Sequence, residues 1–116
     1  MHRKRELMPR TTNRGASALI ARAEPFTSNG SLRAIQDRTG AYVIYSYSTP
    51  IAIIRAETNT VYSNRRKYSV TTSRQQTYTR LGLSEYAKLN GSNLVEVDGA
   101  EELTAAASAD RASYAR

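Results

Sequence analysis

The sequence predicts an α+β fold: a small antiparallel sheet of three or four strands packed with a short helix, plus a C-terminal helical segment. Three observations support this prediction. Residues 41–70 contain five of the eight tyrosines among alternating or continuous apolar residues, a pattern typical of strands. A stretch rich in Ser, Thr and Gln then leads into a short helical pattern that stops at Gly82. An alanine-rich helical pattern follows Asp98.

The length and the distribution of residue types predict a single domain with tails. Residues 1–30 are rich in Arg, Thr, Ser and Asn, and we expect them to form a flexible basic arm. Within this arm, the apolar cluster Ala16–Ala23 is long enough for one or two helical turns before Pro25. Residues 31–90 form the predicted α+β core, and residues 91–116 form an acidic segment with a strand and a helix.

Four strands are predicted in the core. Ala41–Tyr47 has the clearest alternation, with odd-numbered residues on one face and even-numbered residues on the other. Ile51–Ala56 is apolar on both faces and is expected to be central. Pro50 has no N–H to donate, so we expect it in a turn, at the first position of a strand or at an edge. The predicted strands are, in order, Ser31–Ile35, Ala41–Tyr47, Ile51–Ala56 and Thr60–Ser63.

A helix is predicted over Arg74–Leu81. Two capping boxes are possible at its start, one beginning at Ser73 and one at Thr72, each with a glutamine three residues later. Gly82 tolerates the left-handed conformation that is common after a helix, so we expect the helix to end there. The further elements are a helical turn over Ser84–Leu89, a strand over Leu94–Val97, and a helix over Gly99–Tyr114 that begins after Asp98 as its cap.

The residue types present argue against several kinds of site. Without cysteine, disulfides and thiolate metal sites are excluded, and the single histidine, His2, lies in the predicted arm. Glu96 and Asp98 are either a metal-binding or catalytic pair or, as we expect, a solvated strand end and a helix cap. The glycines are isolated, which argues against a phosphate-binding loop. We therefore expect a protein that is not an enzyme and binds neither cofactor nor metal.

The hydropathy pattern predicts a cytoplasmic protein. No run of about 18 apolar residues is present, so we expect no membrane-spanning segment. The basic residues Arg3–Arg5 resemble the start of a signal peptide, but Pro9 and Arg10 follow where an apolar stretch is required.

The net charge of +7 is unevenly distributed along the chain. Residues 1–40 and residues 41–83 each carry +5, whereas residues 84–116 carry −3. This polarity favours a polyanionic partner for the basic part, although a charge of this size also serves solubility.

Basic residues and tyrosines interleave between residues 55 and 80. Arginine and lysine neutralise phosphates, and tyrosine stacks on bases or hydrogen-bonds to phosphates. Alternatively, the tyrosines pack within the sheet, and Arg65–Lys67 is only a solvated turn. The nucleic-acid-binding residues that we expect are Arg65, Arg66, Lys67, Arg74 and Arg80, supported by Tyr62 and Tyr68.

Two blocks of residues carry a resemblance. Residues 45–52 fit the pattern YSYxTPIA within the block Ala41–Ile54, and Lys67–Gln76 fits KYSxTTSxxQ. Over about Ser31–Leu83 the chain resembles a family of small uncharacterised proteins encoded by actinobacterial phages, with relatives in archaea and plasmids. Many members have glycine where this chain has Ser48. The resemblance implies a phage accessory protein in the host cytoplasm and implies no catalytic residues.

Three functions remain open at this point. The first is a non-enzymatic accessory protein that binds nucleic acid through the Arg/Tyr-rich surface. The alternative is an interaction module that binds or inhibits a host protein through an exposed tyrosine-rich sheet edge. The third is a small ribonuclease that uses Arg, Lys and Tyr in place of His.

Overall fold

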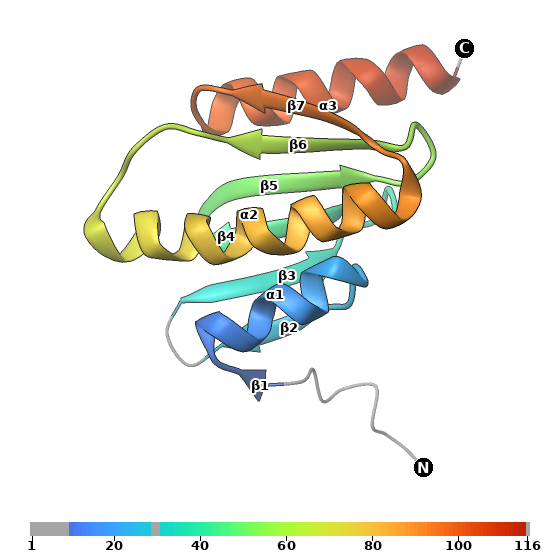
Figure 1. Cartoon of the computed structure of the whole chain (residues 1–116). Coiled ribbons are helices and arrows are strands. Elements are labelled where there is room, and N and C mark those ends of the chain that lie inside the picture. Colours follow the sequence, from blue (N-terminus) through green and yellow to red (C-terminus); the bar gives the residue numbers. More distant parts are fainter. Residues whose placement is uncertain (1–9, 29–30, 116) are drawn as a thin grey trace.

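The computed structural model describes residues 10–28 and 31–115. In this part of the chain, seven strands form one sheet whose spatial order follows the sequence order (Figure 1). The five strands β2 to β6 pair antiparallel, whereas β1 and β7 pair in parallel with their neighbours. The elements are β1 (Arg10–Thr11), α1 (Asn13–Ala21), β2 (Phe26–Ser28), β3 (Leu32–Gln36), β4 (Tyr42–Ser46), β5 (Thr49–Arg55), β6 (Thr60–Asn64), α2 (Val70–Asn90), β7 (Asn93–Val97) and α3 (Ala100–Ala115).

The prediction of a small sheet with three or four strands is wrong, although the α+β class is retained. The difference lies at the two sides of the sheet. Helix α1 returns the chain so that β2 pairs in parallel with β1, and helix α2 does the same for β7 beside β6. Residues 10–28, within the segment expected to be a flexible arm, thus form two strands and a helix, while residues 1–9 lie outside the described residues. Strands of two and three residues are too short to show a periodicity.

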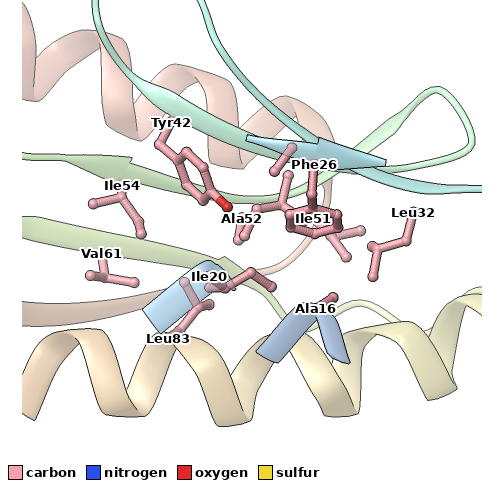
Figure 2. Close-up of a cluster of buried hydrophobic side chains, with 12 residues drawn as sticks. Ala16, Ile20, Phe26, Leu32, Tyr42, Ile51, Ala52, Ile54, Val61 and Leu83 are labelled. Carbon is pink, nitrogen blue, oxygen red and sulfur yellow. The ribbon is translucent and has the colours of Figure 1, made fainter. Parts of the chain in front are cut away.

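The main core lies between one face of the sheet and helices α1 and α2 (Figure 2). Even-numbered residues of β4, such as Tyr42 and Ile44, point to this side, as the alternation predicts. Strand β5 has one extra residue, Ile51, in its pairing with β4. This bulge lies next to Pro50, which has no N–H to donate. The buried side chains of this core include Ala16, Ile20, Phe26, Leu32, Tyr42, Ile44, Ile51, Ile54, Val61 and Leu83.

Helix α2 does not end at Gly82, so the predicted stop at this glycine is wrong. The helix continues to Asn90 and ends at Gly91, whose φ of 63° is the left-handed conformation expected after a helix. Gly82 instead lies where α1 crosses α2: a Cβ atom there would be 2.7 Å from the Ser17 carbonyl oxygen and 2.7 Å from Ile20 Cβ. The glycine is therefore required for the close approach of the two helices.

Helix α3 covers part of the opposite face of the sheet, over β5 and β6. Leu103 and Ala107 pack there against Tyr62 and Ile53. Arg55 is only 5% exposed at the end of β5, and its Nε donates a hydrogen bond of 2.8 Å to the Ala107 carbonyl. In the described residues, no helix is long and apolar enough to cross a membrane.

Candidate nucleic-acid interface

All three helices begin at the same end of the sheet, on the left in Figure 1. This follows from the topology, since β1, β6 and β7 run in the same direction and each leads into a helix. A helix N-terminus carries a partial positive charge and free N–H groups. The three termini therefore give this end of the molecule a positive contribution before any side chain is considered.

The starts of α1 and α2 carry no negative charge. Thr12 caps α1 by accepting a hydrogen bond of 3.0 Å from the Gly15 N–H, and Ser69 caps α2 by accepting one of 3.1 Å from the Thr72 N–H. Neither helix has an acidic residue in its first turn. We call this end the basic pole; it consists of the two helix starts and of the exposed side chains Arg10, Arg14, Arg65, Lys67 and Arg74.

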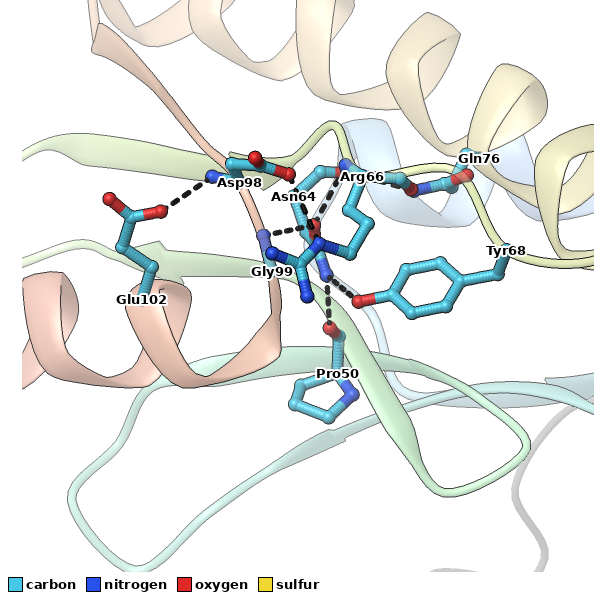
Figure 3. Close-up of polar contacts among 8 residues, drawn as sticks. All are labelled: Pro50, Asn64, Arg66, Tyr68, Gln76, Asp98, Gly99 and Glu102. Carbon is cyan, nitrogen blue, oxygen red and sulfur yellow. Dashed lines mark hydrogen bonds and ion pairs between the residues drawn. The ribbon is translucent and has the colours of Figure 1, made fainter.

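The start of α3 is different because its first turn contains Glu101 and Glu102. The Glu102 carboxylate accepts a hydrogen bond of 3.0 Å from the Asp98 N–H, and Asp98 forms an ion pair of 3.2 Å with Arg66 (Figure 3). The Arg66 guanidinium also lies over Gly99, where a Cβ atom would be 3.2 Å from Cζ. Arg66 therefore connects the basic pole to the acidic start of α3, and part of its charge is neutralised.

The structure separates the other predicted binding residues. Arg65, Lys67 and Tyr68 lie on the connection between β6 and α2, close to Arg74 in the second turn of α2. Tyr62 is 4% exposed beneath α3 and packs in the core, so its ring is not available to a ligand.

Arg80 is the other predicted residue that lies away from the basic pole. It is on the side of α2 that faces β7, where it lines a hollow together with Glu96 and Leu94. The basic residues and tyrosines that interleave in the sequence therefore do not form one surface. The surface that the structure does form also includes Arg10 and Arg14, which belong to the segment predicted from the sequence to be a flexible basic arm.

Asn64 holds the connection between β6 and α2 in place (Figure 3). Its side chain is 1% exposed, and its Oδ1 accepts hydrogen bonds from the N–H groups of Arg66 (3.0 Å) and Gly99 (2.9 Å). Its Nδ2 donates to the Pro50 carbonyl (3.2 Å) and to the Tyr68 hydroxyl (3.0 Å). One buried amide thus fixes the start of α3, the β4–β5 hairpin and the loop that carries the basic residues.

Buried polar side chains fix the first turns of α2 on the sheet. The Ser46 hydroxyl hydrogen-bonds to the Thr72 hydroxyl at 3.0 Å and donates to the Gln75 amide oxygen. Gln75 Nε2 donates to the Ser31 hydroxyl at 3.0 Å. Gln76 Nε2 donates to the Asn64 carbonyl at 2.7 Å. The two sequence blocks that carry the resemblance thus meet inside the protein, where their polar residues support the basic pole.

The opposite end of the sheet contains an ordered turn around Asp37, between β3 and β4. The Asp37 carboxylate accepts hydrogen bonds from the Thr39 hydroxyl (2.6 Å), the Thr39 N–H (2.8 Å) and the Ala41 N–H (3.1 Å). Burial alone raises the pKa of Asp37, but the hydrogen bonds from Thr39 and Ala41 and the charge of Arg55 together lower that pKa below 3.8. In the described residues, no group of three or more His, Cys, Asp or Glu side chains could hold a metal ion.

Comparison with known proteins identifies a family but no activity. Residues 9–81, more than half of the chain, match a family of unknown function, DUF8033. No curated protein and no solved structure matches the chain. The matched region runs from β1 into α2 and includes all residues of the basic pole, whereas β7 and α3 lie outside it.

Proposed function

The chain belongs to DUF8033, a family of unknown function, and from its geometry we propose that it binds nucleic acid at the basic pole without catalysing a reaction. The observation that carries this proposal is that two helix N-termini without acidic residues and five exposed basic side chains lie at the same end of the sheet. Such a surface suits the phosphate backbone, which is recognised by its charge and not by its sequence.

The chemistry available at the pole supports backbone contacts. Arg65, Lys67 and Arg74 supply charges that neutralise phosphates, and the exposed hydroxyl of Thr71 lies in the same helix start. Tyr68 is 38% exposed beside them, with its hydroxyl held by Asn64. Because Asn64 and the buried side chains beneath α2 fix this loop, little ordering is required when a nucleic acid binds.

Binding can be tested by fluorescence anisotropy with labelled duplex DNA and single-stranded RNA over a series of salt concentrations. Each phosphate contact contributes about 0.9 to the slope of log K against log salt on duplex DNA. The variant with Arg65, Lys67 and Arg74 all changed to alanine should therefore lose about 2 to 3 units of this slope.

The matched control uses the two described lysines. Lys67→Ala should reduce the slope by about 1 unit, whereas Lys88→Ala, at the far end of the same helix, should leave it unchanged. Binding that does not weaken with salt, or equal effects of the two lysine substitutions, would overturn the proposal.

A second candidate function, binding of a host protein, is favoured by Tyr47. This side chain is 58% exposed at the tip of the β4–β5 hairpin, and its φ of 59° is uncommon for a residue with a side chain. An exposed tyrosine on a rigid turn suits a protein interface. A pull-down from nuclease-treated host lysate tests it: a captured protein that is lost with Tyr47→Ser supports this function, and capture that Tyr47→Ser leaves unchanged contradicts it.

We also propose, from the resemblance of the two sequence blocks, that the protein is a phage accessory protein acting in the host cytoplasm. Its transcript should then rise after infection or prophage induction. Constant expression in a host without any prophage would contradict this role.

A further inference from the structure

Strand β7 is an exposed edge of the sheet. Among the described residues, nothing pairs with its outer side. Natural edge strands usually carry charged residues, especially lysine, or a proline or a bulge that prevents pairing with another strand. Asn93–Val97 has no lysine, proline or bulge, and Glu96 is its single charged residue. Its side chains are exposed to 58% at Leu94 and to 37% at Val95.

The hydrogen bonds to the rest of the sheet show which backbone groups of β7 point outward. The Asn93 N–H donates to the Asn59 carbonyl (3.0 Å), and the Val97 carbonyl accepts from the Arg65 N–H (2.8 Å). The odd-numbered residues therefore face β6. Because the direction alternates along a strand, the N–H and C=O groups of Leu94 and Glu96 point away from the sheet.

We propose that β7 binds the β7 strand of a second copy of this chain, in antiparallel pairing about a two-fold axis at Val95. In this register Leu94 lies opposite Glu96 of the other copy, and each of these two pairs exchanges two backbone hydrogen bonds. Val95 lies opposite itself. Among antiparallel registers, the outward groups on the two copies match only in those of this parity. A two-fold interface also closes on itself without forming fibres.

The side chains beside the edge suit a second copy. Leu94 and Glu96 lie on the α2 side of the sheet, where Arg80 lines the same hollow as both. The positive charge of Arg80 and the negative charge of Glu96 balance at this edge. The basic pole, by contrast, would repel a second molecule, because each molecule has a net charge of +7. Val95 lies on the α3 side next to Tyr62, its partner in β6, so the pairing would cover two exposed valines.

The size of the contact sets the expected strength. Pairing of two five-residue strands is at the low end of specific interfaces, so we expect a dissociation constant on the order of 1–100 μM. Sedimentation equilibrium of the full chain should give a mass that rises with concentration from 12.9 kDa towards twice that value. A single species of monomer mass at all concentrations up to about 1 mM would overturn the proposal.

Substitutions of Leu94 test the register. Leu94→Glu places like charges opposite each other at two symmetric positions and should weaken the dimer about tenfold. Leu94→Lys instead faces Glu96 of the other copy and should leave the dimer intact or strengthen it. The double variant Leu94→Glu with Glu96→Lys restores opposite charges and should recover the dimer. The matched control is Leu81→Glu, because Leu81 is exposed to 59% on α2, away from the edge.

Val95 gives a test of the axis. Because it lies opposite itself, both Val95→Glu and Val95→Lys should weaken the dimer, unlike the charge-dependent result at Leu94. Circular dichroism and thermal unfolding at low concentration check that each variant is folded. Equal effects of Glu and Lys at Leu94, or dissociation by Leu81→Glu, would overturn the register. A dimer that persists in every β7 variant would exclude β7 as the interface.

Discussion

Replacing Gly82 with alanine tests whether this glycine ends a helix or allows two helices to cross. If Gly82 made no close contact with another helix, alanine would raise the free energy of unfolding by up to about 1 kcal/mol, because alanine has a higher helix propensity than glycine. In the structure, however, Gly82 lies inside α2, and a Cβ atom there would be 2.7 Å from both the Ser17 carbonyl oxygen and Ile20 Cβ. We therefore expect Gly82→Ala to destabilise the protein.

The magnitude follows from the contact distances. Ordinary contacts of a Cβ atom begin near 3.4 Å, so α1 and α2 would have to separate by about 0.7 Å at this point. Overpacking of this kind costs about 1–3 kcal/mol. The separation would also lengthen the 2.7 Å hydrogen bond from the Ser17 hydroxyl to the Tyr78 carbonyl, which contributes about 0.5–1.5 kcal/mol. After the gain in propensity is subtracted, the net loss of unfolding free energy is about 1–3 kcal/mol.

Urea unfolding followed by circular dichroism measures this loss directly, and the midpoint of thermal unfolding should fall by about 4–12 °C. Ser84→Ala is the control, because Ser84 is exposed on the same helix; it should leave the stability unchanged or raise it by about 0.5 kcal/mol. If Gly82→Ala proves more stable than the natural sequence, the close crossing of α1 and α2 at this glycine is refuted.

Three further predictions concern other contacts. A double-mutant cycle of Ser46→Ala and Thr72→Val should give a coupling of about 0.5–2 kcal/mol by urea unfolding, since the two hydroxyls are buried and bonded at 3.0 Å; additivity would contradict the contact. Because the pKa of Asp37 is lowered from 3.8, its carboxylate stabilises the fold above pH 3.8 and loses this effect as the pH falls through the folded-state pKa. The difference in unfolding free energy between the natural protein and Asp37→Asn should therefore shrink below about pH 4, and a difference that stays constant would refute the assignment. Asp98→Ala should free Arg66, steepen the salt dependence of nucleic-acid binding by about 0.9 and change stability by less than about 1 kcal/mol, because the ion pair is exposed; an unchanged slope would show that Arg66 makes no phosphate contact.

Elements whose signal is local could be predicted from the sequence. The strand predicted over Ala41–Tyr47 is confirmed as β4, and the one over Ile51–Ala56 is confirmed as the inner strand β5. The C-terminal helix is confirmed as α3. In each case neighbouring residues share a periodicity that reflects which faces are buried.

Features that depend on distant residues could not be predicted. The parallel pair of β1 and β2 joins segments of two and three residues across α1, and neither segment shows a pattern. The role of Gly82 depends on a helix more than sixty residues earlier, so the residue itself favours a helix end and a helix crossing equally. For the same reason the basic pole was predicted only in part, from Arg65, Lys67 and Arg74.

The arrangement of the sheet has a consequence for the order in which the protein folds. Strands β3 to β6 are joined by short hairpin connections, so their contacts close at small entropic cost, whereas both outer pairings require a helix to form and dock first. We expect the central hairpins to form early and the two crossover units late. Native-state hydrogen exchange should then be slowest in β4 and β5, while β1 and β7 open by fluctuations that leave the centre intact. The outer strands β1 and β7 would therefore be the parts of the sheet most often released from their neighbours.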